Sequence, residues 1–161
     1  MVRTQLVREA GGFDEKLTSG EDFDLWLRIA PFHRIVRVPE VLAFYRFHDG
    51  PQMTKNRFKI IANHWRIQQK FLKWRPEAVR HLARGRVREL THGELMRKGF
   101  DCYWQNDLDT ARRIFRLVMC TGFGSASDWL HMLPSLLPLP CHRWLIAAIR
   151  SHRSKNYVLP K

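Results

Sequence analysis

The chain has 161 residues, of which 45% are hydrophobic, and this composition excludes an intrinsically disordered protein. Its formal net charge is +13, but the charge is uneven. Residues 1–52 hold seven Lys or Arg and eight Asp or Glu, a net of −1; residues 53–161 hold twenty-one and seven, a net of +14, and the two sum to +13. So sharp a change predicts two regions with different roles, which we place at 1–54 and 55–161.

The three cysteines, Cys102, Cys120 and Cys141, show neither paired nor zinc-type spacing, which predicts free thiols in a reducing compartment. No secretory signal follows Met1. Only residues 129–149 approach membrane length, and Pro, His and Arg interrupt them, so two short amphipathic helices fit better than a spanning helix. The sequence therefore predicts a cytoplasmic protein, with contact with the inner face of the membrane as an alternative.

In chain order, residues 4–10 predict a short helix that is closed by the Gly11-Gly12 pair. A second helix is expected from about residue 20 to residue 30, with Thr18 or Ser19 as its cap. Phe23, Trp26, Leu27 and Ala30 share one face of this helix at helical spacing.

Three carboxylates, those of Glu21, Asp22 and Asp24, stand in the first turn of this second helix. The free N–H groups and the positive dipole end of a helix hold such groups in place and keep them ionised. A carboxylate placed there is a candidate general base, although it also stabilises a helix start without any catalytic role. Asp24 lies four residues before Arg28, in the favourable order for an ion pair, so we expect it to be structural.

Residues 33–38 and 41–48 are rich in β-branched and aromatic residues and predict two short strands around a Pro39-Glu40 turn. The predicted fold class is therefore α+β: helices and a two-strand pair, followed by a mostly helical region. A pair of strands this short is not stable alone.

From residue 53 onward the pattern is helical, with helices expected at 57–74, from Pro76, at 86–105 and at 108–120. Gly99, Ala111 and Phe115 match three positions of a tetratricopeptide-type helix pair. There is one such pair rather than an array, so we interpret it as helix–helix packing.

Basic surface attracts polyanions, and aromatic and basic residues alternate at 64–66 and 71–75. These aromatics fall at helical core spacing, and no named nucleic-acid-binding motif is present. The sequence therefore argues against a nucleic-acid partner. The alternatives that it leaves for the basic region are a protein partner and an anionic membrane surface.

Residues 2–54 resemble family 2 glycosyltransferases of the GT-A fold. The resemblance rests on Val2-Arg3, Gly11-Gly12-Phe13-Asp14-Glu15, Gly20-Glu21-Asp22, Asp24-Leu25-Trp26-Leu27-Arg28 and Tyr45-Arg46-x-His48-x-Gly50. It implies a transferase that moves a sugar from a nucleotide-sugar donor to a hydroxyl of a saccharide, lipid-linked or protein acceptor, with inversion as the outcome that a single base favours.

The resemblance also implies roles for individual residues. Asp22 would be the general base, His48 would complete a divalent-metal site for Mg or Mn, and the residues in contact with substrate would be Gly12, Glu21, Trp26 and Arg46. A lone histidine such as His48 is more often not a ligand, and only the flanking residues favour that role here.

The family's nucleotide-binding half has no counterpart in this sequence. Neither a βαβ segment with an Asp-x-Asp motif nor a glycine-rich phosphate loop precedes the acceptor-side motifs. We therefore expect the acceptor-side fragment of a longer enzyme, inactive alone, with weak metal binding and an exposed apolar face where the other half would pack. The alternative is a non-catalytic helical interaction module.

Overall fold

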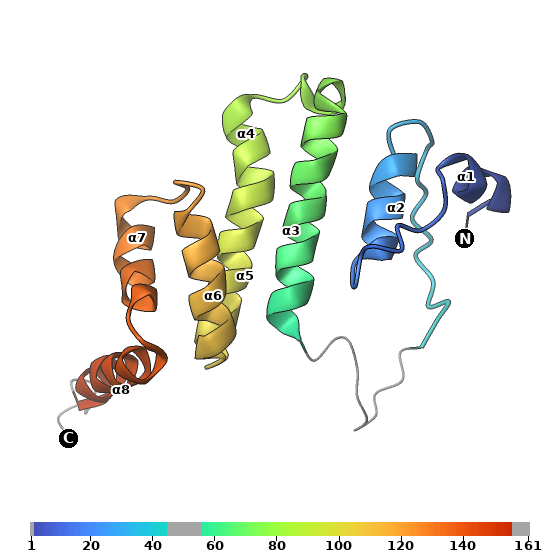
Figure 1. Cartoon of the computed structure of the whole chain (residues 1–161). Coiled ribbons are helices and arrows are strands. Elements are labelled where there is room, and N and C mark those ends of the chain that lie inside the picture. The colour runs from blue at the N-terminus through green and yellow to red at the C-terminus, as the bar shows by residue number, and fades with distance from the viewer. Residues whose placement is uncertain (1, 45–55, 156–161) are drawn as a thin grey trace. The chain divides into compact units, whose positions relative to one another are not determined.

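The computed structural model describes residues 2–44 and 56–155, and all regular elements in these ranges are helical (Figure 1). The chain forms two compact units, Met1–Ala83 and Arg84–Lys161. The first unit contains α1 (Thr4–Glu9), α2 (Glu21–Ile29), α3 (Arg57–Trp74) and the 3₁₀ helix η2 (Pro76–Val79). The second contains α4 (Arg84–Arg88), the π-helical segment η3 (Glu89–Gly93), α5 (Glu94–Trp104), α6 (Leu108–Met119), α7 (Ala126–Met132), the 3₁₀ helix η4 (Leu133–Leu136) and α8 (Leu139–Lys155).

The α+β prediction is wrong for the part of the chain that the structure describes, because it contains no strand. Residues 34–44 run without regular structure, and their side chains are exposed. Strand-forming side chains do not make a sheet unless a neighbouring strand pairs with the backbone. The end of the second predicted strand, residues 45–48, lies outside the described residues.

The first unit has a small apolar core between α2 and α3. Its fully buried apolar side chains within the described residues are Leu25, Ile29, Ala62 and Ile67. The start of α3 is fixed by Asn56, whose side-chain oxygen accepts a hydrogen bond from the Lys59 N–H at 3.0 Å. With so little apolar burial, the polar contacts of this unit matter more to its stability.

Gly20 sets how closely α2 approaches α3. It is the N-cap of α2 and has a left-handed backbone with φ of 79°, so the expected Thr18 or Ser19 cap is wrong. A Cβ at Gly20 would lie 3.0 Å from both His64 and Ile67 of α3. Both the backbone angle and the contact therefore require glycine here.

The second unit is built around the α5–α6 hairpin. A Cβ at Gly99 would lie 2.8 Å from the ring of Phe115, so the glycine lets the two helices come into close contact. Asp107 caps α6 by accepting a hydrogen bond from the Thr110 N–H at 3.2 Å. Among the described residues of this unit, the buried apolar side chains are Leu95, Cys102, Leu108, Ala111, Ile114, Phe115, Val118, Met132 and Ile146.

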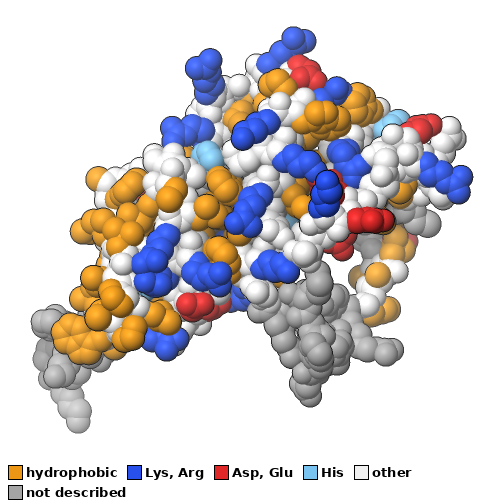
Figure 2. Space-filling model, viewed as in Figure 1, with side chains coloured by type: hydrophobic (Ala, Val, Ile, Leu, Met, Phe, Trp, Pro, Cys, Tyr) orange, Lys and Arg blue, Asp and Glu red, His pale blue; other side chains and the backbone are white. Residues whose placement is uncertain are grey.

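The surface is strongly basic. The face shown in Figure 2 carries many Lys and Arg side chains and few Asp and Glu. Among the helices of residues 2–44 and 56–155, none is both long enough and apolar enough to cross a bilayer. The boundary that we predicted at residues 54 and 55 was drawn from the change in charge and the extent of the family resemblance. The unit boundary reflects packing instead, so the functional division of the chain stays a prediction.

Candidate functional site

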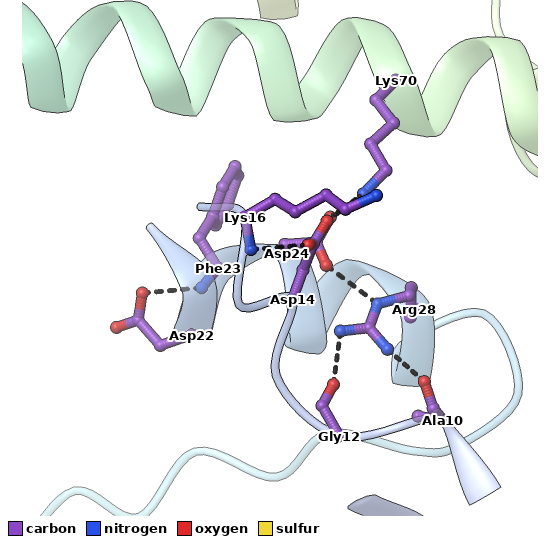
Figure 3. Close-up of polar contacts among 9 residues, drawn as sticks. All are labelled: Ala10, Gly12, Asp14, Lys16, Asp22, Phe23, Asp24, Arg28 and Lys70. Carbon is purple, nitrogen blue, oxygen red and sulfur yellow. Dashed lines mark hydrogen bonds and ion pairs between the residues drawn. The ribbon is translucent and has the colours of Figure 1, made fainter. Parts of the chain in front are cut away.

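Asp24 and Arg28 of α2 form the ion pair that their spacing predicted, and this prediction is confirmed. The Asp24 side chain is buried, and its Oδ2 accepts a hydrogen bond from Arg28 Nε at 2.9 Å. Arg28 also donates to the backbone carbonyl oxygens of Ala10 and Gly12, the latter at 2.7 Å (Figure 3). The guanidinium therefore holds the Gly11-Gly12 turn against α2.

Lys70 extends this network from α3. Its Nζ lies 3.1 Å from Asp24 Oδ1 and 3.0 Å from Asp14 Oδ2. The hydrogen bond from Lys70 lowers the pKa of Asp14, helped by the Lys16 backbone N–H at 3.1 Å. The bond to Asp14 in turn raises the pKa of Lys70, against the opposing effect of burial.

These pKa shifts fix the sign of the pH dependence. The contribution of Asp14 to the stability of the folded unit is present above its unfolded pKa of 3.8, and it is lost as the pH falls through the lower pKa of the folded state. The contribution of Lys70 to the stability of the folded unit is present below its unfolded pKa of 10.5, and it is lost as the pH rises through the higher pKa of the folded state. The Asp14–Lys70 pair is therefore charged on both sides across the neutral range.

A hollow of about 430 Å³ lies beside this network. It is lined by Gly11, Gly12, Phe13, Asp14, Glu15, Lys16, Asp24, Arg28 and Lys70. Gly12, which we predicted to contact substrate, is part of this wall, but its carbonyl oxygen is already bound by Arg28. The wall carries positive and negative side chains that pair with one another. These ion pairs are enough to hold the turn in place, so the hollow does not by itself indicate a ligand.

Asp22, the predicted base, is exposed at the second position of α2. Its Oδ1 accepts a hydrogen bond from the Phe23 backbone N–H at 2.7 Å. Figure 3 shows its carboxylate directed away from the cluster of Asp24, Arg28 and Lys70. Asp22 does not line the hollow described above, so the two carboxylates of one helical turn have separate surroundings.

Trp26 and Glu21 lie close to Asp22 on α2. Trp26 follows Asp22 by four residues, so the two side chains share a face one turn apart, and Trp26 is 41% exposed. Glu21 directly precedes Asp22 and is half-buried. Asp22 and Trp26 therefore share one face of α2, Glu21 only adjoins Asp22 in the chain, and Gly12 lies in the separate Arg28 network.

Several residues of α3 that hold α2 in place were not predicted from the sequence. Asn63 Nδ2 donates to the buried Ser19 Oγ at 2.8 Å, and the His64 ring lies 4.9 Å from the Phe23 ring between centroids. Together with Lys70 they come from a helix more than 40 positions further along the chain. Asn63 and Lys70 lie about two turns apart in α3, so one face of this helix carries both, and this spacing is the local signal that the sequence offers.

Arg46 and His48, the predicted substrate and metal contacts, lie outside the described residues. Among residues 2–44 and 56–155, no three His, Cys, Asp or Glu side chains gather in the way that a metal ion requires. The described residues thus provide no ligand set for Mg or Mn, and the metal remains a prediction that rests on His48.

No family model, curated protein sequence or solved structure matches this chain. The resemblance to family 2 glycosyltransferases therefore rests on the motif residues alone, and the geometry around them is what supports or weakens it.

Proposed function

We propose that residues 2–54 form the acceptor side of a glycosyltransferase, in which Asp22 removes the proton from an acceptor hydroxyl. The observation that carries the proposal is that Asp22 and Trp26 lie one turn apart on an exposed face of α2. An ionised carboxylate and an aromatic surface one turn apart suit a sugar acceptor, which offers both hydroxyl groups and an apolar ring face.

The anchoring of α2 supports this role. A general base must stay within roughly 2.6–3.2 Å of the proton that it abstracts. The Arg28 bonds to the turn and the Lys70 bond to Asp24 fix α2 from two sides. Asp24 is occupied by Arg28 and Lys70, whereas the exposed Asp22 makes none of the bonds that anchor α2.

In the proposed step, the acceptor oxygen attacks the anomeric carbon of the donor while its proton passes to the Asp22 carboxylate. The new bond joins the acceptor oxygen to the sugar, and the bond from the sugar to the nucleotide diphosphate breaks, with the electron pair leaving on the phosphate. Attack from the face opposite the leaving group inverts the configuration. The donor must be held by a nucleotide-binding half that this sequence does not contain.

The test is sugar transfer from a panel of nucleotide sugars to saccharide and lipid-linked acceptors. It compares the chain alone with the chain joined to the in-frame coding sequence immediately upstream. We expect transfer only from the joined protein. In that protein, Asp22→Asn should lower kcat by about 100- to 10,000-fold, with the donor KM little changed.

Asp109→Asn is the matched control, because Asp109 is also an exposed aspartate at the second position of a helix, α6. It should leave transfer unchanged. Near-normal turnover in Asp22→Asn would remove Asp22 from the base role. An upstream sequence without a βαβ segment and Asp-x-Asp motif, together with no transfer, would overturn the proposed function itself.

A further inference from the structure

The segment from α7 to α8 carries an exposed apolar surface in the second unit. We call it the leucine–tryptophan face, and it consists of Leu130, Leu133, Leu136, Leu137 and Trp144, all exposed. The buried side chains of the same segment, Met132, His142 and Ile146, fix which side of α7 and α8 faces the core. Figure 2 shows hydrophobic side chains gathered over α7 and α8, with Lys and Arg beside them.

The backbone beneath this face is held by two arginines of α6. Arg116 donates to the carbonyl oxygens of Ser135 and Leu136 at 2.9 and 2.8 Å. Arg112 donates twice to the carbonyl oxygen of Leu137, at 2.8 and 2.6 Å. These carbonyls end η4 and would otherwise need water. Because the protein's own arginines already bind these carbonyl oxygens, moving the turn out of water into a bilayer interface costs less free energy.

The charge of this part of the chain has one sign. Residues 129–161 hold five Lys or Arg and no Asp or Glu. Arg143 is exposed and directly precedes the exposed Trp144 on α8. Leucine and tryptophan next to uncompensated arginine are the composition of helices that lie in a bilayer interface and bind anionic headgroups. A protein partner would need an acidic, apolar surface of matching shape, whereas an anionic bilayer supplies charge and apolar depth over any outline.

We propose that the leucine–tryptophan face binds the surface of an anionic lipid bilayer, with the end of α7, η4 and the start of α8 in the interface. This goes beyond the proposed sugar transfer and does not depend on it, because it involves only the second unit. Apolar burial of the leucines and Trp144 and headgroup contacts of Arg143 would act together.

The test is co-sedimentation of the full chain with vesicles of pure phosphatidylcholine and of phosphatidylcholine mixed equally with phosphatidylglycerol. We expect binding to the mixed vesicles only, weakened by added salt. The double variant Leu130→Ser/Leu133→Ser should lower the partition coefficient by about tenfold. Leu90→Ser is the matched control, since Leu90 is 47% and Leu133 46% exposed in the same unit, and it should change binding by less than about twofold.

A second variant keeps the proposal testable if the serine variants unfold. Trp144→Phe retains an apolar ring, so it should still bind but lose much of the vesicle-induced blue shift of fluorescence. Absent binding to the mixed vesicles, equal binding to neutral vesicles, or equal losses in the double-serine and Leu90→Ser variants would overturn the proposal. The proposal would also be overturned if the chain dimerised without binding vesicles and the double-serine variant abolished the dimer, because the face would then be a contact between two copies.

Discussion

Replacing the buried Asp24 by asparagine should loosen α2. The side chain of Asp24 is 4% exposed and that of Arg28 is 20% exposed, so their hydrogen bond contributes about 1.5–3 kcal/mol. The Lys70 side chain is 56% exposed, and its ion pair with Asp24 adds less than about 1 kcal/mol. We therefore expect Asp24→Asn to reduce the free energy of opening of α2 by about 2–3 kcal/mol.

Hydrogen exchange measured by mass spectrometry on peptides from residues 4–30 reads this opening directly. A loss of 2–3 kcal/mol corresponds to exchange about 30- to 150-fold faster, at 1.36 kcal/mol per factor of ten. Asp22→Asn is the control within the same helix turn, and the loss of its favourable position at the helix start costs less than about 1 kcal/mol. Exchange less than about threefold faster in Asp24→Asn, or equal changes in both variants, would refute the reasoning.

Two further predictions concern single positions. Gly20→Ala should lower the free energy of opening of α2 by about 1–3 kcal/mol, because it places a side chain at φ of 79° and 3.0 Å from two side chains of α3. Faster hydrogen exchange in α2 would measure this loss. Unchanged exchange would contradict the close packing of α2 on α3. Burial lowers the pKa of His142 below its ordinary value of 6.5, and the positive charges of Arg112 and Arg116 lower it further. As the pH falls, the unfolded chain therefore binds the proton before the folded chain does, and the second unit should lose stability below about pH 6.5. Melting curves taken from pH 7.5 to 5.5 measure this loss. His142→Leu should make the melting temperature depend less on pH.

The sequence predicted the long helices well because their signals are local. The apolar spacing and flanking residues placed α3 at Arg57–Trp74, as observed, and α6 to within one residue at its end. The Asp24–Arg28 pair follows from the four-residue spacing within one helix. The segment 34–44 was misjudged because β-branched side chains favour an extended backbone, whereas a strand exists only where a partner pairs with it.

The site could be predicted only in part. The motif singled out Asp22 and Asp24 together, and no local rule separates two carboxylates of one helical turn. Their surroundings are decided by Lys70, which is 46 positions from Asp24, and by the turn carbonyls that Arg28 binds. Such contacts depend on how helices pack, and a single sequence carries no signal of that packing.

The exposed segment 34–44 gives a last test of the glycosyltransferase reading. Its side chains are exposed and no regular element covers it within the described residues, so trypsin should cut after Arg34 and Arg37 at least about tenfold faster than after Arg28, which is bonded to Asp24. Equal rates at the three sites would mean that the Arg28 network does not hold α2.

If residues 2–54 are one side of a larger enzyme, the missing half should cover this apolar segment. Joining the upstream coding sequence should then slow cleavage at Arg34 and Arg37 while leaving Arg28 unchanged. Unaltered cleavage in the joined protein would mean that the exposed apolar residues serve some other contact, and this would count against the acceptor-side proposal.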